Sequence, residues 1–194
     1  IKADSIASYS HFCQWVITVF MLLFGVSFNM YYLLLIKRWR EVLKSNELKC
    51  YLGISLAAMI IVVLSIMPLY GSIADAVRLS AFQVSSIVTT TGYATADFDA
   101  WPSLAKAVLL ILMFFGGCMG STAGGLKMSR VTVLAQIARN DLRHALRPRE
   151  VSTVILNGRR VDAQGERQIL SYFALYIAVI GAVFLLISFE PFGI

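Results

Sequence analysis

The sequence predicts an all-α membrane protein, and its composition and charge distribution carry this prediction. Of the 194 residues, 58% are hydrophobic, whereas soluble domains are usually about 45–50% apolar. Three segments carry no charged residue and are long enough to cross about 30 Å of hydrocarbon as a helix. These segments are residues 15–36, 50–70 and 168–189, and a fourth uncharged segment, residues 107–126, is interrupted by glycines.

The basic residues predict the orientation of the spans. Of the 17 Lys and Arg residues, five lie in residues 37–49 and nine in residues 127–167. By the positive-inside rule, both basic segments are cytoplasmic and residues 70–102 face the opposite side. The net charge of +6 therefore indicates orientation and contact with membrane lipids, and no nucleic-acid partner is expected.

Residues 75–88 predict a half-helix that enters the membrane and returns. At 1.5 Å per residue this segment covers only about 20 Å, which is too short to cross. Its C-terminal end directs a negative dipole at residues 89–95, Thr-Thr-Thr-Gly-Tyr-Ala-Thr. Threonines followed by Gly-Tyr between two spans are typical of an ion selectivity filter, in which backbone carbonyls replace a cation's hydration shell. Irregular backbone at membrane depth must lie inside protein or beside water, so a filter is favoured over a Thr-rich extracellular loop.

Residues 116–125 contain five glycines in ten positions and predict a break in the fourth span. Each glycine costs about 1 kcal/mol of helix propensity relative to alanine, which disfavours a continuous helix. We expect a helix that begins after Pro102, a glycine-rich loop inside the membrane and then a second helix. We interpret the loop as a constriction on the cytoplasmic side of a pore. The GxxxG spacings of Gly116, Gly120 and Gly124 leave helix packing open as an alternative.

Two interpretations of the glycine-rich segment that involve bound nucleotide or catalysis are excluded. A phosphate-binding P-loop requires lysine directly after its last glycine, but Leu126 separates Gly125 from Lys127 and no strand precedes the segment. A Ser or Cys nucleophile needs a histidine within reach, and the predicted topology places His11 and His144 elsewhere. The sequence therefore predicts neither an enzyme nor an organic cofactor.

The second basic segment predicts a cytosolic helix followed by a β-hairpin. Apolar residues recur at helical spacing from residue 131 to 146, and Arg139, Arg143 and Arg147 share one face. We expect this face to meet solvent or lipid headgroups, with docking of a partner as the alternative. After Pro148, Asn-Gly at 157–158 separates the apolar residues 151–156 from residues 159–161, which predicts a small β-hairpin.

The order of a span, a half-helix, TTTGYAT and a span broken by GGCMGSTAGGLK resembles the Trk/Ktr/HKT superfamily of potassium transporters. It is most similar to the bacterial Trk-type membrane subunit. The resemblance covers essentially the whole sequence, and the two motifs at this separation are specific. It implies channel-like span–pore-loop–span repeats, four to a parent chain, with a broken second span in the complete repeat present here.

The resemblance assigns roles to residues of both motifs. The selectivity filter comprises the backbone of Thr89, Thr90, Thr91, Gly92 and Tyr93, with K+ at Thr90, Thr91 and Gly92. The gating loop comprises Gly116, Gly117, Gly120, Ser121, Thr122, Gly124 and Gly125, and the cations just past it, on the pore side, are Lys127 and Arg130. The Tyr93-Ala94 pair departs from the Gly-Tyr-Gly of tetrameric potassium channels, which implies weaker discrimination between K+ and Na+.

The resemblance also divides the sequence into three parts. Residues 1–49 are the end of repeat two, with a span at about 14–36 and a cytosolic linker. Residues 50–147 are the complete repeat, with its filter at 89–95 and its loop at 116–125. Residues 148–194 are the cytosolic hairpin and the first span of the next repeat, at about 168–189. The other filters and a last span with a pore-blocking arginine are expected outside this sequence, which would supply one wall of a pore.

The implied function is uptake of potassium, the transported ion, across the bacterial cytoplasmic (inner) membrane by a multi-pass protein. The alternative is a channel-like, ion-binding subunit of an ATP-driven potassium pump. The implied partners are the remaining repeats of the parent chain, a second copy in a homodimer and a cytosolic ring of nucleotide-binding regulatory subunits. The cytosolic segments available to such a ring favour the first function.

Overall fold

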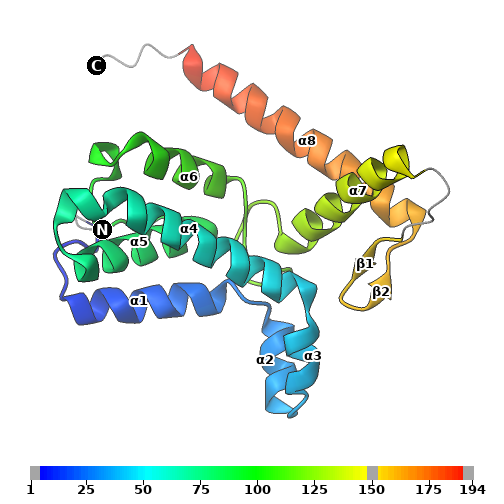
Figure 1. Ribbon diagram of the computed structural model, residues 1–194, viewed down its shortest axis with the longest axis horizontal. Coiled ribbons are helices and arrows are strands. Elements are labelled where there is room, and N and C mark those ends of the chain that lie inside the picture. The colour runs from blue at the N-terminus through cyan, green and yellow to red at the C-terminus, as the bar shows by residue number, and fades with distance from the viewer. Residues whose placement is uncertain (1–4, 148–152, 190–194) are drawn as a thin grey trace. The chain divides into compact units, whose positions relative to one another are not determined.

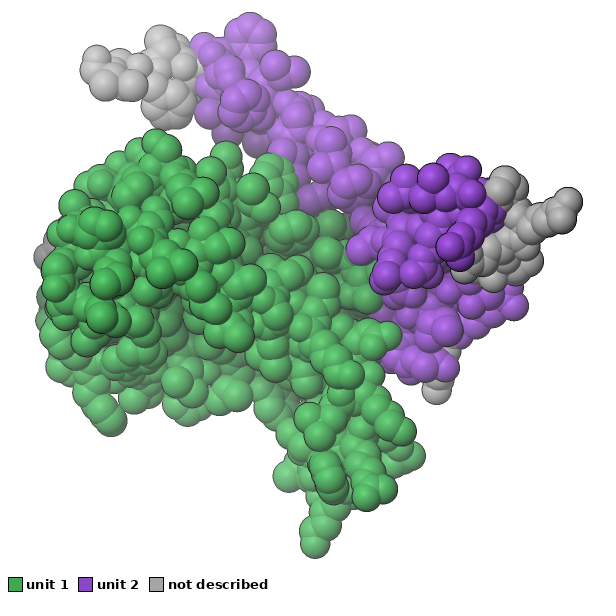
Figure 2. Space-filling model, viewed as in Figure 1, with its two compact units in different colours: residues 1–132 green, residues 133–194 purple. Residues whose placement is uncertain are grey.

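The computed structural model describes residues 5–147 and 153–189 and consists of helices and one short hairpin (Figure 1). The chain forms two compact units, Ile1–Thr132 and Val133–Ile194 (Figure 2). Among the described residues, two helices are long and apolar enough to cross a membrane, and a bent helix pair could provide a third span. The mainly helical, membrane-type fold predicted from the sequence is thus confirmed.

The first predicted span, residues 14–36, does not form a single continuous helix. It consists of α1 (His11–Phe24) and α2 (Phe28–Leu35), which meet at an angle of 90°. Gly25 ends α1 and Ser27 precedes α2. The Gly25 carbonyl accepts a hydrogen bond of 2.8 Å from the Cys118 N–H, so this peptide group serves the glycine-rich loop and not the helix.

The next helices agree with the predicted span and half-helix. The short α3 (Trp39–Lys44) precedes α4 (Asn46–Tyr70), whose N-terminus is capped by the Ser45 side chain. The chain turns at Gly71, which has a φ of +62°, and enters α5 (Ile73–Val88). With 16 residues, α5 has the length of about 24 Å expected of a helix that cannot cross the bilayer.

The core of the first unit surrounds α5. In Figure 1, α1, α4 and α6 (Ser103–Met113) lie alongside α5. A short 3-10 helix, η1 (Phe98–Ala100), leads from the filter segment toward α6. The Trp101 Nε1–H donates to the Tyr70 hydroxyl at 3.0 Å, which joins this connection to the end of α4. Apolar residues of α4, α5 and α6 fill the space between them, including Val62, Ile66, Leu79, Val84, Val88 and Leu109.

The break predicted in the fourth span is confirmed. α6 ends at Met113 and α7 (Met128–Leu146) begins after a non-helical segment. A parallel bridge between Phe115 and Leu126 closes the two ends of that segment. The alternative of GxxxG helix packing requires Gly116, Gly120 and Gly124 to share one face of a helix. They lie in a non-helical segment and therefore do not.

The second unit begins within α7 and contains the hairpin and α8 (Ala163–Ser188). Strands β1 (Ile155–Leu156) and β2 (Arg159–Arg160) pair antiparallel. The turn residues Asn157 and Gly158 have φ values of +49° and +80°, as a type I′ turn requires. The predicted hairpin is confirmed, but its first strand begins only at Ile155. Residues 151 and 152 lie outside the described residues.

Candidate functional site

The filter segment follows directly from the C-terminal end of α5. Thr89 ends the helix, and its side-chain hydroxyl donates to the Ser85 carbonyl at 2.6 Å. The next three N–H groups fold back onto the helix end: that of Thr90 reaches the Ile87 carbonyl at 3.0 Å, and those of Thr91 and Gly92 reach the Ser86 carbonyl at 2.8 and 3.5 Å. The segment is thus held by the last turn of a buried helix.

These N–H contacts determine where the carbonyls point. In a planar trans peptide, the N–H of one residue and the C=O of the preceding residue point in opposite directions. Because three successive N–H groups point at the end of α5, the carbonyls of Thr89, Thr90 and Thr91 all point away from it. No hydrogen bond to these oxygens, or to that of Gly92, occurs among the described residues. The backbone therefore presents a row of carbonyl oxygens with no protein donor.

The carbonyls that follow this row are engaged by protein. The Ser86 hydroxyl donates to the Tyr93 carbonyl at 2.6 Å, and the Ile6 N–H donates to the Ala94 carbonyl at 3.1 Å. Tyr93 was included among the predicted filter residues, but its carbonyl points back to α5 and its side chain is exposed. The carbonyl oxygens to which no described residue donates are therefore those of residues 89–92.

Backbone strain coincides with this row. Thr90 has a φ of +54° and Gly92 a φ of +79°. A positive φ is uncommon in a β-branched residue and costs on the order of 1–3 kcal/mol, a cost that folded proteins concentrate at functional sites. The alternation of left-handed residues with ordinary ones is what allows successive N–H groups to point the same way.

The glycine-rich loop, residues 116–125, is attached to the bend between α1 and α2. Besides the Cys118 contact with Gly25, the Thr122 N–H donates to the Phe24 carbonyl at 3.4 Å, and the Phe28 N–H donates to the Gly120 carbonyl at 3.1 Å. The two irregular segments thus satisfy each other's main-chain groups. This mutual arrangement is required because both lack regular helical bonds.

Some glycines of the loop are required by close packing. A Cβ at Gly116 would overlap the Gly124 carbonyl, and one at Gly117 would lie 2.6 Å from the Gly25 carbonyl. Gly120 and Gly125 have φ values of +74° and +68°, which glycine adopts without steric cost. The glycine content therefore reflects backbone-on-backbone contact within a non-helical loop.

The loop also touches the filter segment directly. The Gly124 N–H donates to the Thr90 side-chain oxygen at 2.7 Å. Thr90 is the residue with a positive φ, so the loop holds the side chain of the strained residue. The two predicted motifs, far apart in the sequence, are adjacent in the structure.

The two predicted cations lie at the end of the loop. The Lys127 ammonium donates to the Ala123 carbonyl, and both Lys127 and Arg130 are partly buried. Lys127 therefore binds the loop itself. Of the remaining predicted loop residues, Ser121 donates from its hydroxyl to the Cys118 carbonyl at 2.6 Å, which closes a turn within the loop.

Sequence reasoning missed residues that position both motifs. Ser86 holds the filter segment through its carbonyl and its hydroxyl, and Gly25 provides the contact point of the loop. The Tyr51 hydroxyl donates to the Leu22 carbonyl at 3.0 Å next to that bend. The Ser-Ser pair before the threonines was the one visible signal, since serines at a helix C-terminus often bond to nearby backbone.

The other end of α5 is fixed by a polar cluster. The Arg78 guanidinium donates to the Asp75 carboxylate at 2.7 Å and to the Gln14 side-chain oxygen on α1. The Asp75 pKa is lowered, first by this side-chain hydrogen bond from Arg78. The half-helix is thereby attached to α1 through a charged and an amide group.

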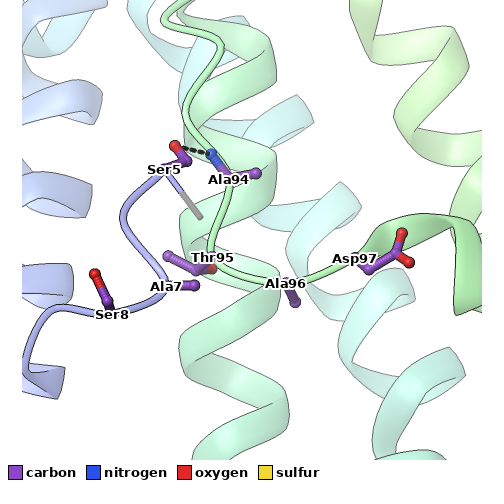
Figure 3. Close-up of a pocket in the computed structure, with 7 residues that line it drawn as sticks. All are labelled: Ser5, Ala7, Ser8, Ala94, Thr95, Ala96 and Asp97. Atoms are coloured by element: carbon purple, nitrogen blue, oxygen red, sulfur yellow. Dashed lines mark hydrogen bonds between the residues drawn. The ribbon is translucent and has the colours of Figure 1, made fainter. Parts of the chain in front are cut away.

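An open cavity of about 510 Å³ lies at the end of the filter segment, between residues 5–8 and 94–97 (Figure 3). The Ala94 N–H donates to the Ser5 hydroxyl at 3.2 Å across it, and the Asp97 carboxylate points away from the Ser5 segment (Figure 3). The buried Thr95 hydroxyl has no hydrogen-bond partner among the described residues. The cavity has a mixed polar and apolar lining and includes Ala94 and Thr95, the last two residues of the predicted filter segment.

A family model and several proteins of known type match this chain. The family model, described as TrkH, cation transport protein, matches residues 1–192. The chain is 31% identical over 163 residues to the Trk system potassium uptake protein TrkG of Escherichia coli strain K12, covering 81% of this chain and 33% of that protein. It is 29% identical over 167 residues to TrkH of Salmonella typhimurium, covering 84% and 35%. The chain thus spans about a third of the length of these relatives.

A solved structure shares the fold. The crystal structure of the potassium transporter TrkH from Vibrio parahaemolyticus matches with a TM-score of 0.87 and 26% sequence identity. The match covers 95% of this chain and 41% of that one.

Proposed function

Because the chain belongs to the TrkH family of cation transport proteins, we propose that it forms one wall of a potassium uptake pathway. In this proposal the backbone of Thr89, Thr90, Thr91 and Gly92 binds K+, with Tyr93 completing the segment. Residues 116–125 form the gate beneath it. Uptake is passive through the pore once the gate opens.

The observation that carries this proposal is the row of carbonyls at residues 89–92, to which no described residue donates a hydrogen bond. A main-chain carbonyl without a hydrogen-bond donor destabilises the folded chain unless water or a ligand binds to it. Three that point the same way, at the negative end of a half-helix, present the oxygen ligands that replace the water around K+. A Thr-rich surface loop has no need for such alignment, nor for a positive φ at Thr90.

The position of the glycine-rich loop supports its role as the gate. It lies against the filter through Gly124 and Thr90 and is held by main-chain contacts to the bend at Gly25. Hydrogen bonds of this kind each contribute about 0.5–1.5 kcal/mol. A segment held by a few such bonds can leave its position at modest cost, whereas a continuous helix cannot.

The proposal extends to the parent chain and its surroundings. The remaining repeats supply the other walls and filters, and the assembly is a homodimer in the bacterial inner membrane. A cytosolic ring of nucleotide-binding subunits acts on α7 and the hairpin, and Lys127 and Arg130 lie at the cytoplasmic exit. The three-part division at residues 49 and 147 follows the repeats of this parent chain.

Flux through the full-length parent in liposomes tests the function and the gate together. Thallium uptake is measured without ATP or partner subunits, for the wild type and for a variant that lacks residues 117–124. We expect uptake by the wild type and faster uptake by the deletion variant. Absence of uptake from both, with correct folding shown by size-exclusion chromatography, would favour the subunit of an ATP-driven pump.

A further inference from the structure

Glu47 is a buried carboxylate for which the proposed pathway has so far provided no role. It lies in the first turn of α4, and only 3% of its surface is exposed. Glutamate is almost never this buried unless its charge is paired or hydrogen-bonded. Glu41 nearby on α3 is exposed and forms an ordinary surface pair with Arg38.

The partners of Glu47 come from the glycine-rich loop and from α7. Its carboxylate accepts the Met119 N–H of the loop. The N–H and hydroxyl of Ser129, in the first turn of α7, and the Lys127 ammonium lie near this carboxylate and favour its charged form. The Glu47 side chain on α4 thereby joins the glycine-rich loop to α7, the helix that follows the loop.

The start of α7 explains why this carboxylate is needed. The first N–H groups of a helix have no partner within the helix, and a side-chain oxygen of the preceding residue normally accepts one of them. Lys127 occupies that place before Met128, and an ammonium group cannot accept a hydrogen bond. The Gly117 carbonyl accepts the Met128 N–H at 3.1 Å, and the Glu47 carboxylate lies near Ser129, the next residue. The negative charge of Glu47 is favourable at the positive end of α7.

From this geometry we propose that Glu47 is a positioning residue that holds the gating loop closed against the start of α7. The proposal rests on the proposed gating function of residues 116–125. The loop and the first turn of α7 share one carboxylate, so a displacement of α7 weakens the contact with Met119. Glu47 thereby connects movement of the cytosolic helix to opening of the loop.

Substitution of Glu47 tests the proposal in the full-length parent, with thallium flux into liposomes as the readout. Glu47→Ala removes every acceptor and is expected to raise basal flux roughly ten-fold, the order expected for losing a hydrogen bond to a charged group. Glu47→Gln keeps an oxygen for Met119 but loses the charge toward α7, and an intermediate increase is expected. Glu41→Gln is the matched control, and its flux should equal that of the wild type. A purely structural role for Glu47 predicts reduced flux instead.

Labelling of Cys118 gives a readout that does not depend on transport. This thiol is fully buried, and its residue contacts Gly25 from within the loop. With all other cysteines replaced by serine, a methanethiosulfonate reagent should modify Cys118 severalfold faster in the Glu47→Ala and Glu47→Gln variants than in the wild type. If the Glu47→Ala variant does not reach the membrane, both flux and labelling are measured on the Glu47→Gln variant.

The outcomes separate this proposal from the gate itself. If the 117–124 deletion raises flux but the Glu47 variants change neither flux nor labelling, Glu47 does not hold the loop and the gate stands. If the deletion leaves flux unchanged while Cys118 becomes accessible in the Glu47 variants, the loop is held by Glu47 and is not the gate, which overturns the proposal as stated. Flux and labelling that rise together, with Glu41→Gln unchanged, support it.

Discussion

At the scale of single residues, the filter segment depends on backbone conformation more than on side chains. Gly92 has a φ of +79°, and a Cβ there would meet no atom within 4 Å. A side chain at this position is therefore opposed only by conformational preference, which costs roughly 1 kcal/mol or more for non-glycine residues in the left-handed region.

We predict that Gly92→Ser lowers the ratio of K+ to Na+ permeation, because the backbone relaxes and the carbonyls lose their alignment. The ratio is measured in liposomes that hold the full-length parent. Gly71→Ser is the matched control, since Gly71 also has a positive φ of +62° and open space around it but lies outside the filter. An unchanged ratio of K+ to Na+ permeation in the Gly92→Ser variant would contradict the filter assignment.

The backbone arrangement of residues 89–92, the proposed filter, could be predicted from the sequence because its contacts are local. A helix end, three threonines and a glycine specify most of the backbone contacts within a single stretch of chain. Ser86 belongs to the same stretch and could have been included. Gly25 and Glu47 could not have been, because their roles arise from contacts with residues 118–119, which only the folded chain brings near.

At the scale of elements, the bend between α1 and α2 shows the limit of prediction by hydropathy. Residues 14–36 are uncharged and mainly apolar, and a single glycine in such a stretch is tolerated in a helix. The bend occurs because the backbone there bonds to the loop, so the partner determines it. The break between α6 and α7 was predictable, since five glycines in ten positions disfavour a helix without any partner.

We predict that Gly25→Ala destabilises the protein by about 1–3 kcal/mol, the usual cost of overpacking a filled site. The added Cβ would overlap the Tyr51 hydroxyl and approach a Thr89 methyl group at 3.0 Å. Thermal unfolding of the detergent-solubilised parent measures the effect. Gly53→Ala on α4 is the control, since nothing lies within 4 Å of its Cβ and alanine favours helix. Equal unfolding temperatures for the two variants would contradict this account of the bend.

At the scale of the whole molecule, the apolar surface exceeds what the chain can bury. None of the most apolar window of α8 is buried, and only 22% of that of α4. Many large apolar side chains of α1, α4 and α8 are exposed. Helices of this kind are expected to face lipid or neighbouring helices, which agrees with the proposed walls supplied by other repeats.

We predict that residues 1–194 alone conduct no thallium in liposomes, whereas the full-length parent does. One filter strand provides one quarter of the expected oxygen ligands, and the other three strands are needed to surround the ion. Circular dichroism shows whether the isolated chain keeps its helices, so that loss of folding is recognised. Potassium-selective flux through the isolated, folded chain would disprove the single-wall interpretation.

If K+ binds at Thr90 as proposed, the hydrogen bond from the Gly124 N–H to the Thr90 hydroxyl would couple the affinity for the ion to the position of the loop. If a change in the loop alters the conformation of Thr90 and thereby the affinity for K+, then bound K+ must alter the loop equilibrium by the same factor. External potassium would then be a ligand that regulates its own pathway as well as the ion carried. In the proposed transporter, the concentration of K+ would set how often the loop opens.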